Sequence, residues 1–207
     1  MITSRQQTVL DCIVTRRSVR HFQDRPVAKE ILEDVVRAAC QAPSAHNRQP
    51  WRFVIIGSTS IRQKLAQAMG ADFYQDLLRD GISVEDAKVQ VQRSHQRLIK
   101  APAVVLFCLD QKEIDDYPDM LRRSAAHQMM VQSVAMAGQN LLLAAHACGL
   151  GGVWICAPLF APAAVQQALQ LPTSWLPQGL VYLGYPAADL PKERPRRPIE
   201  EVLRTME

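Results

Sequence analysis

The chain has 207 residues, of which 48% are hydrophobic and 21% charged, and its formal net charge is +4. This length suits a single globular domain over residues 1–207, and so mild a charge argues against nucleic-acid binding, which usually needs a stronger basic face. No stretch is apolar enough to span a bilayer and the N-terminus lacks the apolar core of a signal peptide, so we expect a cytoplasmic protein with no membrane part.

The first half of the chain alternates helical and strand-like patterns. Apolar spacing together with Pro and Gly boundaries predicts, in order, helix 4–15, helix 26–42, strand 51–57, helix 59–69, helix 84–100 and strand 101–110. The segment between the third and fourth of these helices is more polar and is left without an assignment.

The second half begins with the longest helix of the chain. The predicted elements are helix 122–148, strand 151–157, helix 162–169, strand 179–186 and an extended basic tail, 192–203, with a closing helical turn. Four short strands among about six helices predict an α+β layered fold. The long helix is apolar nearly all round between Met129 and Ala147, so we expect it to be covered on every side, in part by a second subunit.

The cysteines and histidines do not form a metal-binding pattern. The five cysteines, Cys12, Cys40, Cys108, Cys148 and Cys156, have no C-x-x-C or finger spacing, so each is expected to be a buried small residue. The histidines on helices have no partner at ligand spacing, and we therefore predict no metal site.

Arginine dominates the basic residues, with 18 Arg against 6 Lys, and gathers near both ends of the chain. The two groups are Arg16, Arg17 and Arg20 near the start and Arg194, Arg196 and Arg197 near the end. Guanidinium groups bind phosphate bidentately, so the two groups could converge on one small anion. Alternation along an extended segment would put Arg16, Ser18 and Arg20 on one side. The alternative is a set of surface ion pairs that contribute little to stability.

The segment APSAHNRQPWRF, residues 42–53, gathers polar side chains between a helix and a strand. Ser44, His46, Asn47, Arg48 and Gln49 stand within six positions, and prolines flank them. Side-chain amides can read the edge of a planar heterocycle because they offer a donor and an acceptor in fixed geometry. The alternative is an Asx-turn that serves only to bury the following tryptophan. The residues alone leave both interpretations open.

Five segments in order resemble the FMN-dependent nitroreductase superfamily. They are RRSVRHF, APSAHNRQPWRFVII, NLLLAAHACGLGGVWICAP, LGYP and RPRRPIEEV. The stretch from DYPDML to APLF looks most like a subgroup related to the flavin domain of deazaflavin-coenzyme biosynthesis enzymes. The resemblance covers nearly the whole chain and implies a three-layer fold with a central, mostly antiparallel sheet flanked by helices.

The resemblance also implies which residues hold FMN. Those facing its phosphate and ribityl chain would be Arg16, Ser18, Arg20, Arg194 and Arg196, with Arg197 as an alternative to Arg196. Those bordering the ring would be Pro43, Ser44, Ala45, Asn47, Gly152, Ile155, Cys156 and Ala157, with Gln49 either at the ring or supporting the loop. The role of His46 stays open, and the thiol of Cys156 is expected to be a packing group and not a redox group.

By resemblance, the protein is a homodimeric oxidoreductase that uses NAD(P)H in two half-reactions to reduce a small organic acceptor. The acceptor would be a nitroaromatic, a quinone or a dehydro-flavin-like compound, and no side chain need act as an acid or base. Three alternatives remain open at this point. They are a specialised flavin reaction (dehydro-deazaflavin reduction, dehalogenation or benzimidazole formation), a flavin carrier or sensor without turnover, and a packing domain without a cofactor.

Overall fold

The computed structural model describes residues 4–187 and 193–206. The α-helices are α1 (Ser4–Thr15), α2 (Lys29–Ala39), α3 (Thr59–Arg79), α4 (Val84–Lys100), α5 (Met120–Ala147), α6 (Pro162–Leu169) and α7 (Ile199–Val202). The strands are β1 (Trp51–Ile55), β2 (Ala103–Asp110), β3 (Gly151–Ile155) and β4 (Trp175–Gly184), and short 3-10 turns are η1 (Ala45–Asn47), η2 (Gln111–Glu113) and η3 (Ala157–Phe160). None of the helices in this described part combines the length and the hydrophobicity of a transmembrane span.

The four strands form one sheet in the order β1-β2-β4-β3, and every pairing in it is antiparallel. The α+β prediction is therefore confirmed. Strand β2 is buried along its whole length, because it pairs on both edges and is covered on both faces. The sequence of a strand buried on both faces is a continuous apolar run, and residues 103–108, AVVLFC, form such a run.

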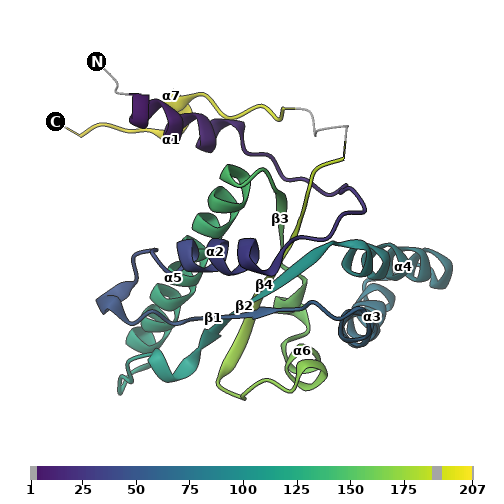
Figure 1. The fold of residues 1–207 in the computed structure, drawn as a ribbon. Coiled ribbons are helices and arrows are strands. Elements are labelled where there is room, and N and C mark those ends of the chain that lie inside the picture. Colours follow the sequence, from purple (N-terminus) through teal and green to yellow (C-terminus); the bar gives the residue numbers. More distant parts are fainter. Residues whose placement is uncertain (1–3, 188–192, 207) are drawn as a thin grey trace.

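Helices cover both faces of the sheet and give three layers (Figure 1). Val105 and Phe107 of β2 point into a core shared with α2 and α5, whereas the neighbouring Val104 and Leu106 point into a core shared with α3, α4 and α6. The two cores follow from the two-residue period of a strand, which sends successive side chains to opposite faces. In Figure 1, α1 and α7 lie outside these layers, and both ends of the chain project from the same side.

Several element boundaries differ from the predicted ones. Helix α3 continues to Arg79, well past the predicted end at residue 69, and the chain turns only at Gly81, whose φ is +80°. Gly70 lies inside the helix and does not end it. It faces Val91 of α4 at close range, so its missing side chain leaves room for the two helices to pack. Strand β4 begins at Trp175 although Pro177 cannot donate a ladder hydrogen bond, and the register shifts opposite it between Phe107 and Cys108.

The expectation that all five cysteines are buried is wrong. Cys148 and Cys156 are exposed, and only Cys108 of the five cysteines is fully buried. Burial raises the pKa of the Cys108 thiol to about 12, so this group stays protonated and inert. Within one chain Met136 of α5 is 39% exposed and Ala135 next to it is exposed as well, so the expected cover of this side by a second subunit stays a prediction.

Trp154 of β3 is held between two glycines. A Cβ added at Gly138 of α5 would lie 2.5 Å from the Trp154 ring, and a Cβ added at Gly179 of β4 would lie 2.4 Å from it. The ring also stacks at a tilt on Phe107, with ring centroids 4.9 Å apart. Helix α5 can therefore approach the sheet edge at this level only because both positions lack a side chain.

We expect Gly179→Ala to lower the free energy of unfolding by about 1–3 kcal/mol, because the added methyl group has no room beside the indole. Urea unfolding followed by tryptophan fluorescence measures the change. Gly57→Ala is the matched control, since a Cβ there meets no atom within 4 Å, and it should change stability by less than about 1 kcal/mol. Equal losses in the two variants would contradict the packing account.

Candidate functional site

An extended segment, residues 16–23, follows α1 and is called here the N-terminal arm. Ser18 forms a parallel bridge with Gly152 of β3, and the Val19 N–H donates to the Gly152 carbonyl at 3.1 Å. The Val19 side chain is buried against Gly151, where an added Cβ would lie 2.6 Å from it. The arm therefore lies along the free edge of the sheet, with Val19 turned inward and its neighbours turned outward.

Both ends of the arm are fixed to the body of the protein. At its start, the Thr15 hydroxyl lies 2.9 Å from Nε2 of His146, near the end of α5. At its far end, Phe22 pairs with Pro186 and the Gln23 N–H donates to the Tyr185 carbonyl at 2.9 Å. Side chains on the arm are thus held in place by contacts with α5 and with the segment after β4.

The arm and the C-terminal tail together form a hollow of about 590 Å³, called here the arginine hollow. It is lined by Arg16, Arg17, Ser18, Arg20, Glu193, Arg194, Pro195 and Arg196. The five residues predicted to surround a phosphate are all among them. Arginines from the two extremities of the chain therefore lie around one space, which is what the sequence analysis anticipated for a shared anion.

Two neighbouring arginines have other partners. Arg17 also borders the hollow, but its guanidinium donates to the Val14 and Arg16 carbonyls and lies 3.1 Å from the Glu193 carboxylate. Arg197 is not part of the lining and lies 3.7 Å from Glu201 on the exposed tail. The one acidic residue of the lining is thus engaged by Arg17, and Arg196 rather than Arg197 faces the hollow.

The hollow has a positive electrostatic environment. Burial, and then the charges of Arg16 and Arg17, lower the pKa of His146, so the imidazole is neutral near pH 7. Within the described residues Arg16, Arg194 and Arg196 make no ion pair, and Arg20 reaches only the Ser18 carbonyl, at 3.4 Å. Unpaired guanidinium groups gathered on one space favour an anion there, and phosphate suits their planar forks.

The predicted ring-binding residues of β3 lie away from the hollow along the strand. Gly152 touches the arm, and a Cβ there would meet Leu183 at 2.9 Å and Leu142 at 3.0 Å, so packing already requires a glycine. Ile155 ends the strand, and Ala157 begins η3. Cys156 between them is exposed, so the expectation that its thiol packs in the interior is wrong for the single chain.

The loop between α2 and β1, residues 42–50, has an unusual backbone. His46, Asn47 and Gln49 have φ values of +51°, +53° and +49°, although none of them is glycine. Non-glycine residues in this region are strained, and such strain concentrates at functional sites. The Ser44 hydroxyl accepts from the Gln49 N–H at 3.0 Å, which closes the loop on itself.

Contacts outside the loop hold this conformation. The Ala45 N–H donates to the Ser133 hydroxyl of α5 at 3.3 Å, and Ser133 in turn donates to the Met129 carbonyl. The Gln49 amide donates to the Asn47 side chain at 3.3 Å, so Gln49 supports the loop in this structure. Exposed side chains on the loop include His46, Asn47 and Gln49, which leaves their polar groups available to a ligand.

The loop and the arginine hollow are not adjacent within one chain. The loop docks on α5 at Ser133, whereas the arm docks on α5 at His146. These positions are thirteen residues apart, which corresponds to about 20 Å along a helix axis. The structure therefore brings together the residues predicted to bind the phosphate, but it does not bring the predicted loop residues next to them within one chain.

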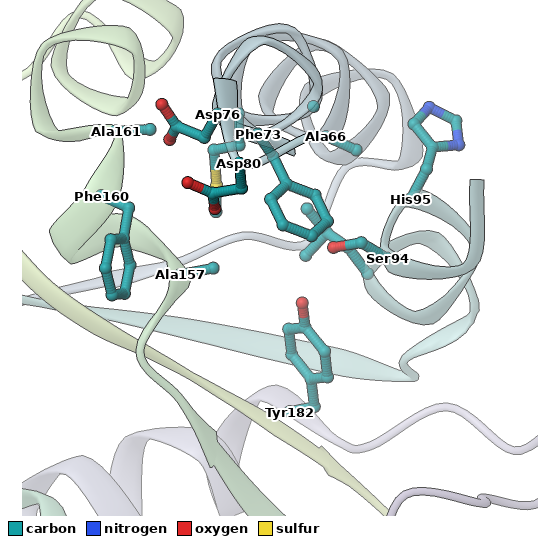
Figure 2. A pocket seen from close by; sticks show the side chains of 13 residues that line it. Ala66, Phe73, Asp76, Asp80, Ser94, His95, Ala157, Phe160, Ala161 and Tyr182 are labelled. Carbon is teal, nitrogen blue, oxygen red and sulfur yellow. The ribbon is translucent and has the colours of Figure 1, made fainter. Parts of the chain in front are cut away.

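An apolar cavity of about 360 Å³ opens beside η3. It is lined by Ala66, Met69, Gly70, Phe73, Asp76 and Asp80 of the α3 segment, Ser94, His95 and Leu98 of α4, Ala157, Phe160 and Ala161 near η3, and Tyr182 of β4. Figure 2 shows the Tyr182 and Ser94 hydroxyls directed toward the same space near the Phe73 ring. Burial raises the pKa of Tyr182 to about 12, so its hydroxyl is a hydrogen-bond donor at neutral pH.

Among these residues only Ala157 was predicted from the sequence to belong to a site. Phe160 and Ala161 lie near η3, and the other lining residues lie on α4, on β4 and along the α3 segment, whose part after residue 69 had no predicted structure. The one usable signal was Ser94 next to His95 within helix 84–100, two polar residues on the side of the helix that also carries buried Leu98. Such a signal is weak, because half-buried polar residues are common on packed helices.

The fold and the arginine-lined edge of its antiparallel sheet define a nitroreductase-like oxidoreductase. The chain belongs to the Nitroreductase family, whose model matches residues 13–185. It is 30% identical over 179 residues to an inferred NADH dehydrogenase/NAD(P)H nitroreductase of Archaeoglobus fulgidus, with 86% of this chain and 84% of the relative covered. The family resemblance seen in the sequence is therefore confirmed.

Solved structures agree with the fold. A BluB-like flavoprotein from Clostridium difficile 630 matches with a TM-score of 0.80 and 25% identity, covering 96% of this chain and 99% of the other. An inferred nitroreductase from Desulfovibrio desulfuricans, solved in complex with FMN, matches with a TM-score of 0.70 and 27% identity, covering 94% of each chain. The nitroreductase-like fold predicted from the sequence is thereby confirmed.

An ionic network fixes the end of the loop to the sheet. Arg52 of β1 donates to the Gln49 carbonyl at 3.1 Å and reaches Glu113 at 2.8 Å and buried Asp110 at 3.0 Å. Burial alone would raise the pKa of Asp110. Hydrogen bonds from the Ser174 hydroxyl and the Lys112 N–H, with the charges of Arg52 and Lys112, outweigh it and hold this pKa below 3.8.

We expect Asp110→Asn to destabilise the protein by about 1–3 kcal/mol at pH 7, because a buried charged acceptor is lost. A lowered carboxyl pKa contributes stability that is complete above the ordinary pKa and is lost as the pH falls through the folded-state value. The difference in the free energy of unfolding between wild type and variant should therefore decrease below about pH 4. Urea unfolding from pH 7 to pH 2.5 measures it, and the exposed Asp116→Asn serves as control. A gap that stays constant over this range would contradict the assignment.

Proposed function

We propose that this protein is an FMN-dependent NAD(P)H oxidoreductase and that the arginine hollow holds the FMN phosphate. The observation that carries the proposal is that Arg16, Arg20, Arg194 and Arg196, from opposite ends of the chain, line one space together with Ser18. A phosphomonoester carries up to two negative charges and accepts several hydrogen bonds, so it suits this donor set. The FMN complex of the Desulfovibrio relative supports this choice of cofactor.

The ribityl chain and ring would extend from the hollow along β3. Gly152 adjoins Ser18 at the start of this path, and Ile155, Cys156 and Ala157 lie at its end. The apolar cavity next to Ala157 would take apolar parts of the ligands, with the Tyr182 and Ser94 hydroxyls fixing their orientation. The backbone N–H groups of Cys156 and Ala157 would hydrogen-bond the polar edge of the ring.

We further propose that Pro43, Ser44, Ala45 and Asn47 reach the ring from a second copy of the chain. Within one chain the loop and the N-terminal arm contact α5 at points about 20 Å apart along its axis. Side chains of the loop therefore do not reach the arginine hollow of their own chain. The left-handed residues of the loop turn its polar groups outward, where a partner could use them. Each homodimer would then hold two complete sites built from both subunits.

FMN supplies the redox chemistry when it is bound, since its ring can accept a hydride from a nicotinamide and pass electrons on. The residues of this chain bind the phosphate, orient the ring and keep water away from it. The donor would leave before a small organic acceptor enters, such as a nitroaromatic or a quinone. No side chain near the hollow needs to transfer a proton for either step.

The proposal predicts a yellow protein in which Arg196 and Arg197 have different roles. Anaerobic NADPH or NADH should bleach the flavin absorbance. Arg196→Ala should weaken FMN binding by about 1–3 kcal/mol, because a charged hydrogen-bond partner is lost. Arg197→Ala, the adjacent control, should leave the Kd nearly unchanged, since its exposed pair with Glu201 contributes little. Fluorescence titration of the apoprotein with FMN gives both constants.

Other outcomes would separate the remaining alternatives. A protein that binds FMN but is bleached by neither nicotinamide would be a carrier or sensor. A colourless protein that also ignores added FMN would be a packing domain, and the proposed function would be wrong. Equal effects of the two arginine substitutions would refute the assignment of Arg196 to the phosphate.

Exposed apolar surface supports the proposed homodimer. On α1, Val9, Leu10, Ile13 and Val14 are each at least 44% exposed. A second apolar hollow of about 370 Å³ lies on α5, where Val134, Leu142 and Trp154 are among the lining residues. The tail adds Ile199, Val202, Leu203 and Met206, each at least 59% exposed. So much apolar surface is typical of an obligate interface, which is large and hydrophobic.

We expect the wild-type protein to sediment as a dimer and Ile13→Asp to weaken dimerisation by about 2 kcal/mol or more, because a charge would enter an apolar interface. Val89→Asp on α4 is the matched control, since Val89 is 46% exposed and Ile13 is 47% exposed. Sedimentation velocity over a dilution series measures the change. If Ile13→Asp remains a dimer while Val89→Asp does not, the interface lies on another face.

A further inference from the structure

A second basic space, called here the basic groove, lies between the N-terminal arm and the outer side of α4. Its volume is about 430 Å³. The arm contributes Arg20 and His21, and the helix contributes Arg93, Arg97 and Lys100. Spacings of four and three residues place the three helical cations on one side of α4, where they face the arm.

The positive charge of this groove is not balanced by the protein. No Asp or Glu is among its lining residues, and Arg93, Arg97 and Lys100 make no ion pair within the part of the chain that the structure describes. The acidic residues of α4, Glu85 and Asp86, lie in its first turn, about 10 Å from Arg93 along the axis. At that distance salt screens most of the attraction between exposed charges.

Repulsion among like charges on one helix face is unfavourable, and a bound anion would relieve it, so this cluster suits an anionic ligand. The FMN phosphate does not account for it. The arginine hollow already supplies four guanidinium groups to one phosphate, and the two spaces share only Arg20. The basic groove therefore has capacity for a second anionic group beside the cofactor.

We propose that Arg93 and Lys100 bind the 2′-phosphate of NADPH and make the enzyme prefer NADPH to NADH. This inference rests on the proposed function, because it concerns the donor that would reduce the flavin. NADPH differs from NADH only by a phosphomonoester, and guanidinium and ammonium groups bind that group through charge-assisted hydrogen bonds. Helix α4 carries Ser94 and Leu98 toward the apolar cavity and the cations toward the groove, so a single helix would contact both ends of the donor.

Calorimetric titration of the FMN-loaded protein with 2′,5′-ADP and with 5′-AMP tests the groove without turnover. We expect 2′,5′-ADP to bind at least about tenfold more tightly than 5′-AMP in the wild type. Arg93→Gln/Lys100→Gln should remove this difference and leave 5′-AMP binding unchanged. The control Lys64→Gln/Lys88→Gln removes the same charge from exposed positions outside the groove and should keep the preference.

A kinetic measurement completes the test. The ratio of kcat/KM for NADPH to that for NADH should fall about tenfold in Arg93→Gln/Lys100→Gln, with the NADH value unchanged. An unchanged ratio would overturn the inference, as would inorganic phosphate binding as tightly as 2′,5′-ADP, since the groove would then be a general anion site. If neither nicotinamide reduces the flavin, the proposed function itself fails, whereas reduction by both without preference defeats only the present inference.

Discussion

The attachment of the N-terminal arm to β3 is the constraint on which the rest of the site depends. The backbone pairing of Ser18 and Val19 with Gly152 fixes the register of the arm against the sheet. A shift by one residue would turn Arg16, Ser18 and Arg20 inward and Val19 outward. Gly151 makes the correct register favourable, because only a position without a side chain leaves room for Val19.

The packed core of the protein and the segments proposed to bind ligands are largely different parts of the chain. The sheet and the two cores contain almost all the buried apolar residues, and the Tyr182 hydroxyl is the one side-chain polar group that the sheet contributes to the proposed site among the described residues. The other groups proposed to bind ligands lie on the arm, the tail, the loop, the end of β3 with the start of η3, and both sides of α4. The loop carries the strained residues His46, Asn47 and Gln49, which contacts with Ser133 and Arg52 hold in place.

Much of this arrangement was predictable from sequence where the physical cause is local. Alternation along an extended segment placed Arg16, Ser18 and Arg20 together, and the strand β2 was readable from its apolar run. Causes that act over long sequence distances were not readable. The residues near Gly179 in the sequence do not indicate that it must leave room for Trp154. Loop 42–50 contains no glycine, so its sequence does not indicate that three of its residues adopt left-handed φ values. The cavity and the basic groove were missed because a helical pattern does not tell which neighbours each side of α4 will meet.

Helix α4 illustrates how one element can serve chemistry of two kinds. Its inner side is apolar apart from a few hydroxyl and imidazole groups, and its outer side is cationic. Low dielectric on the inner side strengthens each hydrogen bond that Tyr182 and Ser94 can make, whereas solvent on the outer side weakens each ion pair. Several cations would therefore be needed on the outer side to hold the proposed anion, and Arg93, Arg97 and Lys100 lie there together. The same reasoning applies to the arginine hollow, where several guanidinium groups surround the proposed phosphate site.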